Sequence, residues 1–303
     1  MTHLTLALDW TPNINHIGFF VAKELGFYEK KGIQLNIADP TQDNYQTTPA
    51  KKLENNEADF AICPFESIIS LNNKIRKVDA IAVFAILQED LSSIASLKSA
   101  HINSPKNLDG KIYASYQARY EDEIVKCMIK NDQSSGNIQI TYPEKLGIWN
   151  TLLTGEADST WIFDNWEGIE AKSKNIDLST FKMKDYNIPY GYSPVVICKK
   201  EKLNSNIQIY KDFIEASKNG FLHVKENLKQ SAEILTNYLT DRDRENISVM
   251  QSITCTYPYF DRPEICGKMD KNKINEFLNW IVKNKLESDV ILTQELFTNE
   301  LLG

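Results

Sequence analysis

Leu8-Asp9-Trp10-Thr11-Pro12-Asn13, which directly follows the apolar run that begins at Leu4, is the stretch that decides the fold of this chain. The run predicts a buried β-strand, and residues 16–26 predict a helix that ends at Gly26. Open α/β sheets bind ligands where a strand leads into a helix, because backbone N–H groups and the helix dipole converge there. Trp10 is therefore placed to stack on a flat ring, and its alternative role is that of a core or hinge aromatic.

Size and charge limit the class of protein. The chain has 303 residues, enough for two domains, with 42% hydrophobic and 25% charged residues, as in ordinary globular proteins. Its net charge of −7 argues against a nucleic-acid partner. No apolar run approaches the ~20 residues that a membrane span needs, so we expect no membrane span.

Neither the cysteines nor the N-terminus carries a special signal. Five cysteines and four histidines are scattered without a Cys-x-x-Cys pair, which predicts reduced thiols and no metal site. Met1-Thr2-His3 leads straight into the first strand without a signal-peptide pattern. The sequence as it stands predicts a cytoplasmic protein; a chain trimmed at this end would instead be periplasmic or anchored at the cell surface.

Short apolar runs alternate with amphipathic stretches along the chain, which is typical of α/β architecture. Strands are predicted at 33–38, 58–63, 81–87, 93–97, 112–115, 138–140, 157–163 and 193–198. Helices are predicted at 51–56, 66–71, 121–130, 148–153 and 166–171, and in a helical C-terminal segment at 210–222, 228–239 and 273–285.

The two halves resemble each other. A helix, a polar turn, Ala-Asp and a strand occur around Ala58-Asp59 and again around Ala157-Asp158, which indicates a structural duplication. We expect a discontinuous first lobe of residues 1–98 plus 193–303, a second lobe of residues 99–192, and a ligand cleft between them.

The opening segment with His16, the Gly26-Phe27-Tyr28 motif, Asp39-Pro40 and residues 155–158 together resemble the type II periplasmic-binding-protein fold. More narrowly, they resemble the family of fungal thiamine-pyrimidine synthases and bacterial binding proteins for thiamine pyrimidine precursors. The resemblance covers most of the first 200 residues. It implies an α/β protein of two lobes that clamp a ligand, with aromatic stacking on the pyrimidine.

The resemblance also implies an alternative activity, that of the fungal synthases. The chain differs from these enzymes at the positions that carry their chemistry. Fungal synthases bind pyridoxal phosphate through a lysine, consume a histidine of their own chain and carry a cysteine-rich run. An ungapped placement puts Cys63 where that lysine would be and Ser67 where that histidine would be, and Cys63 cannot form a Schiff base. The region that corresponds to the cysteine-rich run, residues 192–198, holds one cysteine.

The candidate ligand-binding residues follow the predicted strands or lie in the segment 190–193, which leads into the strand at 193–198. No catalytic residue is assigned, since the sequence lacks a Ser-His-Asp order, a nucleophile elbow and a Walker motif. The candidates are Asp9, Trp10, Asn13, His16, Pro64, Glu66, Ser67, Ser115, Tyr116, Arg119, Tyr120, Asp164, Trp166, Glu167, Tyr190 and Tyr192.

Each candidate also has a structural alternative. Asp9 could accept a hydrogen bond from an exocyclic amine or anchor the turn, and Glu66 could bind a ring amine or begin a helix. Arg119 could bind a phosphate or carboxylate, or pair with a glutamate on a solvated helix. The synthase turn that corresponds to residues 115–121 is glycine-rich and holds a phosphate; this stretch has no glycine, so close backbone approach is disfavoured.

The sequence therefore predicts a non-catalytic protein that needs no cofactor. It would bind a flat nitrogen heterocycle related to the thiamine pyrimidine, in biosynthesis or salvage, with an ABC-type transporter as partner if it serves uptake. One alternative is a pyridoxal-phosphate-dependent hydroxymethylpyrimidine phosphate synthase with a relocated lysine such as Lys145. The other is a binding protein for a sulfonate-type anion, centred on Arg119.

Overall fold

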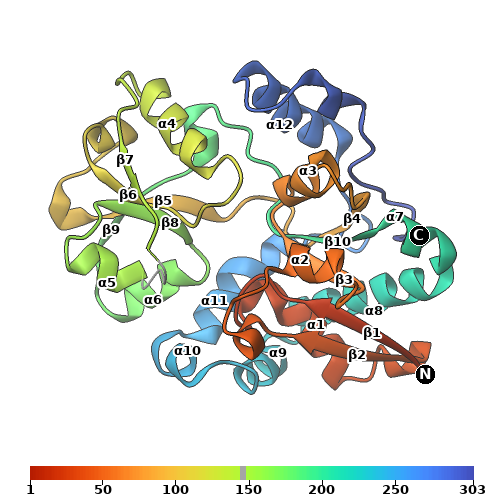
Figure 1. Cartoon of the computed structure of the whole chain (residues 1–303). Coiled ribbons are helices and arrows are strands. Elements are labelled where there is room, and N and C mark those ends of the chain that lie inside the picture. The colour runs from red at the N-terminus through yellow and green to blue at the C-terminus, as the bar shows by residue number, and fades with distance from the viewer. Residues whose placement is uncertain (144–147) are drawn as a thin grey trace. The chain divides into compact units, whose positions relative to one another are not determined.

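The computed structural model describes residues 1–143 and 148–303, and the chain divides into two compact units (Figure 1). Unit 1 comprises residues 1–90, 191–274 and 290–303, and unit 2 comprises residues 91–190 and 275–289. Lys145 lies outside the described residues. In the described part of the chain, no helix combines the length and apolar character that a membrane crossing requires.

Unit 1 is built on a five-stranded sheet with strand order β2-β1-β3-β10-β4. Its first strand runs parallel to β2 and β3, whereas β10 runs antiparallel to β3 and β4. Every residue of β3, β4 and β10 is buried, which explains why these strands are nearly continuous apolar runs. The strands are β1 (Thr2–Ala7), β2 (Ile33–Ala38), β3 (Phe60–Cys63), β4 (Ala80–Ala85) and β10 (Val195–Lys199).

Helices complete unit 1. Phe60 of β3 stacks on Phe213 of α8 with ring centroids 4.0 Å apart, so the long helix α8 covers the sheet with aromatic contacts. The helices that begin in this unit are α1 (Ile17–Glu24), α2 (Pro49–Glu54), α3 (Glu66–Asn73), α7 (Lys200–Ser205), α8 (Ile207–Glu226), α9 (Leu228–Thr236), α10 (Asp241–Asn246), α11 (Val249–Thr256) and α12 (Lys271–Lys283).

Helices α1 and α8 approach each other through glycines. A Cβ atom added to Gly220 would lie 2.0 Å from the backbone oxygen of Gly18 and 2.9 Å from the Cβ of Ala22. The contact is therefore between backbones and leaves no room for a methyl group.

Gly220→Ala is expected to lower the free energy of unfolding by about 1–3 kcal/mol, because the added methyl group overpacks this contact. Urea unfolding followed by circular dichroism measures the change. Asn219→Ala, on the exposed side of the same helix, is the matched control and should stay within about 0.5 kcal/mol of wild type. Equal stability of the Gly220→Ala variant and the wild type would contradict the close approach.

Unit 2 repeats the arrangement, with strand order β7-β6-β8-β5-β9. Here β6 runs parallel to β7 and β8, and β5 runs antiparallel to β8 and β9. The strands are β5 (Ser92–Leu97), β6 (Ile112–Ala114), β7 (Gln139–Thr141), β8 (Ser159–Phe163) and β9 (Leu178–Phe181), and the helices are α4 (Glu121–Asn131), α5 (Ile148–Leu153) and α6 (Glu167–Ser173).

The repeated Ala-Asp pair has the same structural role in both units. Asp59 accepts the backbone N–H of Thr5 at 2.8 Å and donates its own N–H to the carbonyl of Thr5 at 2.9 Å. Asp158 makes the same two bonds with Ile112, each at 2.8 Å. Each aspartate thus joins the start of its strand to the neighbouring parallel strand, β1 in unit 1 and β6 in unit 2, which supports the duplication predicted from the sequence.

The unit boundaries differ in three places from the lobe boundaries expected above, one of which is that residues 191–192 belong to unit 1. Strand β5 pairs with β8 and β9, so residues 91–98 belong to unit 2. Residues 275–289, which contain most of α12, also belong to unit 2. Short apolar runs do not show which sheet a strand joins, and the expected lobes rested on chain order alone.

Candidate functional site

Polar and aromatic residues follow the neighbouring parallel strands β1 and β3 of unit 1. Asp9 and Trp10 come after β1, and Cys63 ends β3 just before α3. The Ser67 hydroxyl is hydrogen-bonded to the Cys63 thiol, and the charges of Asp9 and Glu66 raise the pKa of that thiol. We call Asp9, Trp10, Cys63, Glu66 and Ser67 the unit 1 strand-end site.

His16 holds Asp9 in place. The His16 ring is fully buried, and its Nε2 lies 2.7 Å from Oδ1 of Asp9. The backbone N–H of Asn13 donates to His16 Nδ1 at 3.3 Å, so the ring nitrogen that carries the proton is Nε2, which donates to Asp9. The Asp9 side chain keeps 22% of its surface exposed, so a fixed carboxylate reaches solvent at the end of β1.

Asn13 has a capping role. Its side-chain oxygen accepts the N–H of Asn15 at 2.9 Å, and its Nδ2 donates to the carbonyl of Thr11 at 3.0 Å. Asn13 and His16, both candidate ligand-binding residues from the sequence, are therefore buried groups that shape the turn and orient Asp9.

Trp10 is one of the exposed aromatic residues of unit 1. It is 37% exposed, and its ring packs at 5.4 Å and 51° against that of Tyr45, which is also exposed. Sequence reasoning missed Tyr45, because it lies in a polar segment after β2 without a strand-end pattern. The two rings leave apolar surface open to a planar ligand.

Pro64, Glu66 and Ser67 form the turn between β3 and α3. The N–H of Ser67 donates to the carbonyl of Pro64 at 3.0 Å, and α3 begins at Glu66, whose side chain is buried. Glu66 thus takes the first-turn position expected of a helix-starting acid.

Burial raises the pKa of the Cys63 thiol, and the charges of Asp9 and Glu66 raise it further. A neutral thiol is a poor nucleophile. Iodoacetamide at neutral pH is therefore expected to alkylate the exposed Cys255 and to leave Cys63 unmodified, as read by peptide mass spectrometry. The urea-unfolded chain is the control, in which both should react; labelling of native Cys63 as fast as Cys255 would contradict this environment.

In unit 2, the turn between β6 and α4 is built around Glu121. The Glu121 carboxylate accepts the backbone N–H groups of Tyr116 and Ala118, each at 3.0 Å, and the hydroxyl of Tyr113 at 2.7 Å. Ser115 is buried and donates to Asp122 at 2.7 Å. Burial raises the pKa of Glu121.

Arg119 is paired within unit 2. Its guanidinium donates to the Glu287 carboxylate and, at 2.8 Å, to the hydroxyl of Tyr120, which in turn donates to Glu287 at 2.9 Å. The arginine is thus held by an acid from the 275–289 segment, as the structural alternative anticipated. A sulfonate site centred on Arg119 is disfavoured.

Two tryptophans near the end of β8 differ in their burial. Trp166 is only 4% exposed and belongs to the core, whereas the half-buried Trp161 packs edge-to-face on Tyr190 at 5.3 Å. Trp166 was a candidate ligand-binding residue from the sequence, whereas its burial places it in the core. Asp164 accepts a bond from Ser93 at 2.9 Å, and Glu167 accepts the N–H of Phe163 at 2.9 Å, so both acids support the strand end.

Tyr190 and Tyr192 belong to different units, because the chain passes from unit 2 to unit 1 between Tyr190 and Gly191. Tyr190 belongs to unit 2 and contacts Phe277 at 5.4 Å. Tyr192 belongs to unit 1 and is buried; its hydroxyl accepts the N–H of Asp270 at 2.9 Å, and the Lys273 ammonium lies 4.5 Å from its ring. Tyr192 is therefore part of the interior.

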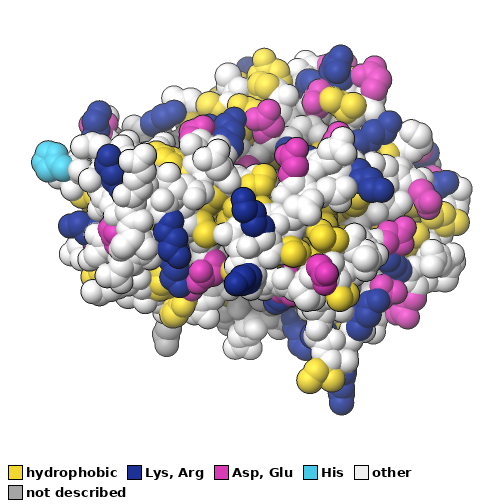
Figure 2. All heavy atoms as spheres, turned by 90° about the horizontal axis from the view of Figure 1, so that it is seen from above, with side chains coloured by type: hydrophobic (Ala, Val, Ile, Leu, Met, Phe, Trp, Pro, Cys, Tyr) yellow, Lys and Arg dark blue, Asp and Glu magenta, His cyan; other side chains and the backbone are white. Residues whose placement is uncertain are grey.

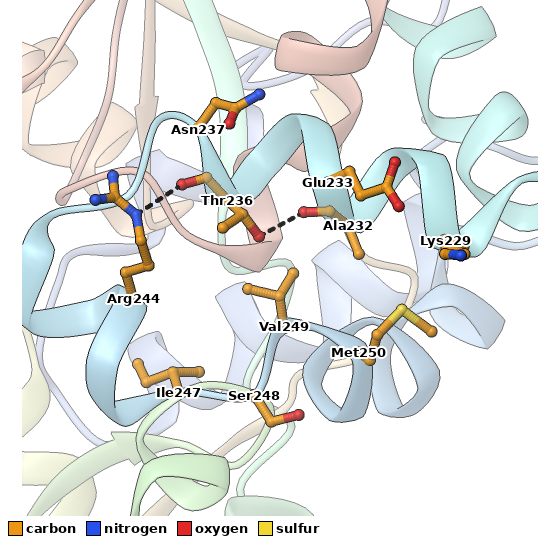
Figure 3. Close-up of a pocket in the computed structure, with 10 residues that line it drawn as sticks. All are labelled: Lys229, Ala232, Glu233, Thr236, Asn237, Arg244, Ile247, Ser248, Val249 and Met250. Carbon is orange, nitrogen blue, oxygen red and sulfur yellow. Dashed lines mark hydrogen bonds between the residues drawn. The ribbon is translucent and has the colours of Figure 1, made fainter.

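A separate open pocket of about 490 Å³ lies on unit 1 among α9, α10 and α11 (Figure 3). Arg244, which lines the pocket, donates to the backbone carbonyl of Thr236 at 3.3 Å. The Thr236 hydroxyl donates to the backbone carbonyl of Ala232 at 2.7 Å. These two donors are therefore used by the backbone, and the other polar residues of the lining are Lys229, Glu233, Asn237 and Ser248. None of the predicted site residues lines it.

The strand-end residues do not fit pyridoxal phosphate. The loop after β3 has no lysine between Cys63 and Ser67, and the charges that act on Cys63 are carboxylates. The N–H groups of the turn before α4 are used by Glu121. Among the described residues, no group of three or more His, Cys, Asp and Glu side chains is placed to hold a metal ion.

The face of the molecule drawn in Figure 2 carries charged side chains of both signs. On the face in Figure 2, lysine and arginine side chains are interspersed with aspartate and glutamate and do not form a single-sign patch. This mixed surface agrees with the net negative charge of the chain.

Two α/β units with matching sheets and with side chains gathered at strand ends define a protein of the periplasmic-binding-protein fold. The chain belongs to the family described as NMT1/THI5 like, whose model matches residues 13–230. The fold and the family resemblance predicted from the sequence are thus confirmed.

Two curated relatives align with almost the whole chain. A formylaminopyrimidine-binding protein of Halalkalibacterium halodurans is 21% identical over 301 residues, which is 96% of this chain and 88% of that protein. A 4-amino-5-hydroxymethyl-2-methylpyrimidine phosphate synthase of Legionella pneumophila is 23% identical over 309 residues, 99% of this chain and 92% of that protein.

Solved structures show the same fold. The ligand-binding component of an ABC-type import system from Staphylococcus aureus matches with a TM-score of 0.74 at 15% identity. The alignment covers 100% of this chain and 98% of the Staphylococcus aureus chain. A Candida albicans protein with the generic periplasmic-binding-protein fold has a TM-score of 0.69 at 12% identity, covering 99% and 97%.

Proposed function

We propose that the chain is a binding protein for a 4-aminopyrimidine of the thiamine-precursor class, with the unit 1 strand-end site as its recognition element. The observation that carries the proposal is Asp9: a carboxylate fixed by the buried His16 and exposed beside the open ring of Trp10. A carboxylate accepts hydrogen bonds from an exocyclic amine, and an indole stacks on the ring that bears the amine.

The names of the relatives support this ligand class, since both contain an aminopyrimidine. The binding role is favoured over synthase chemistry because the loop after β3 places Cys63, a buried thiol, where a Schiff-base lysine would be needed. In the binding role we propose that the protein needs no cofactor and delivers its ligand to an ABC-type transporter.

Calorimetric titration of the whole chain with the hydroxymethylaminopyrimidine and with formylaminopyrimidine tests the proposal. Saturable binding of at least one, with thermal stabilisation by the same compound, is the expected result. A parallel titration with pyridoxal phosphate should give no aldimine absorbance band. An aldimine that borohydride reduces onto a lysine would overturn the binding role and identify the lysine.

A further inference from the structure

Asp9 keeps its negative charge in the unit 1 strand-end site. The backbone N–H of Asn13 donates to His16 Nδ1 at 3.3 Å, so the buried imidazole is neutral and its Nε2–H donates to Asp9 at 2.7 Å. A neutral donor fixes the carboxylate without cancelling its charge. Within residues 1–143 and 148–303, no lysine or arginine forms an ion pair with Asp9, whose side chain is 22% exposed. The charge is therefore available to a ligand.

The titratable neighbours of Asp9 at the end of β3 are an acid and a neutral thiol. Burial raises the pKa of the Cys63 thiol, and the charges of Asp9 and Glu66 raise it further, so the thiol stays protonated at neutral pH. Glu66 begins α3 and is 2% exposed. Neither side chain brings a positive charge to the carboxylate of Asp9.

The charges that act on Tyr45 are also negative. Its ring lies 5.4 Å from that of Trp10, and we call these two exposed rings the ring pair. Burial raises the pKa of the Tyr45 hydroxyl, and the charges of Asp39 and Asp243 raise it further, so the phenol stays neutral. The neighbouring cation, Arg242, lies 3.0 Å from Asp243 and is paired with it.

Aromatic faces beside a carboxylate favour a cationic ligand. The face of an indole or a phenol attracts a cation, and the attraction is stronger where water is displaced. A 4-aminopyrimidine is a weak base, and protonation of the ring nitrogen opposite the amine spreads a positive charge over the ring and the amine. The amine then makes a charge-assisted hydrogen bond to a carboxylate, which is about twice as strong as a neutral one.

We propose that the unit 1 strand-end site takes the aminopyrimidine as its ring-protonated cation, with the amine on Asp9 and the charged ring against the ring pair of Trp10 and Tyr45. The inference rests on the proposed function and specifies the charge of the ligand at that same site. The proton comes from solution and stays on the ring nitrogen of the bound ligand.

The uptake of a proton gives binding a definite pH dependence. The site should raise the ring pKa of the bound ligand by about one unit, which is a tenfold preference for the cation. Affinity is then highest below the ring pKa of the free ligand and falls as the pH rises through that value. It levels off above the ring pKa of the bound ligand.

Nuclear magnetic resonance of the hydroxymethylaminopyrimidine labelled at its ring nitrogens measures the bound pKa, because protonation shifts the signal of the nitrogen that receives the proton. The complex with the whole chain is titrated between about pH 6 and 9, on either side of neutrality. Calorimetry in two buffers of different ionisation enthalpy counts the protons taken up. A bound ring pKa equal to or below the free value would overturn the inference while the proposed function stands. Failure to bind at every pH would contradict the proposed function itself.

A neutral analogue controls for titration of the protein. 2-Amino-4-methylbenzyl alcohol has a benzene ring in place of the pyrimidine, keeps the amine, methyl and hydroxymethyl groups, and has no ring nitrogen to protonate. It should bind at least about tenfold more weakly, and its affinity should not depend on pH. A pH dependence equal to that of the pyrimidine would assign the proton to the protein and overturn the inference.

Asp9→Asn tests the charge of Asp9, and Asp212→Asn, which removes a carboxylate near Lys31, is the matched control. In Asp9→Asn the ring pKa of the bound ligand should return to about that of the free ligand, whereas the control should keep the raised value. An equal fall in both variants would show an effect of net charge alone and overturn the inference. Should Asp9→Asn bind too weakly to measure, Tyr45→Leu, which removes one ring of the pair, is expected to lower the bound ring pKa by about 0.4–0.7 unit. No change in that variant would contradict the account.

Discussion

Replacing Asp9 by asparagine is expected to weaken aminopyrimidine binding about 10- to 100-fold, since a hydrogen bond to a charged group contributes about 1.5–3 kcal/mol. The amide is isosteric and its oxygen can still accept the His16 Nε2 proton, so the fold should survive. Its NH2 group, however, would face the amine of the ligand with a donor instead of an acceptor.

Calorimetric titration of the two proteins measures this loss. Asp212→Asn is the matched control: it removes a carboxylate of unit 1 that lies near Lys31, and it should bind as the wild type does. Wild-type affinity of Asp9→Asn would show that Asp9 only anchors the turn, the structural alternative that the sequence left open.

Trp10→Ala is expected to weaken binding about 10- to 30-fold. Stacking contributes about 0.5–1.5 kcal/mol beyond the apolar area covered, at about 25 cal/mol per Å². Trp10→Phe keeps an aromatic face and should retain part of the affinity. Because Trp10 is partly exposed, the urea midpoint of both variants should remain near that of wild type. Unchanged affinity of Trp10→Ala would rule out stacking on this ring.

The strand and helix pattern could be predicted from the sequence because local apolar periodicity sets it. The stretch around Asp9 and Trp10 does follow β1, and the Ala-Asp pairs do mark equivalent points of the two units. The short edge strand β9 and the short helices α10 and α11 were missed, since four to eight residues carry little periodicity.

Details of the candidate site depend on tertiary packing, which sequence reasoning did not reach. Which of Trp161 and Trp166 is buried follows from how β8 and α6 pack. The partner of Arg119 is Glu287, 168 positions along the chain. The inward carboxylate of Glu121 requires positive φ angles at Gln117 and Tyr120, where no glycine signals them.

The structure of the chain bound to the hydroxymethylaminopyrimidine tests the central claim most directly. The account predicts the pyrimidine ring against Trp10, with its exocyclic amine within about 2.7–3.2 Å of the Asp9 carboxylate. A ligand bound in the pocket among α9, α10 and α11, with Asp9 and Trp10 left untouched, would contradict it.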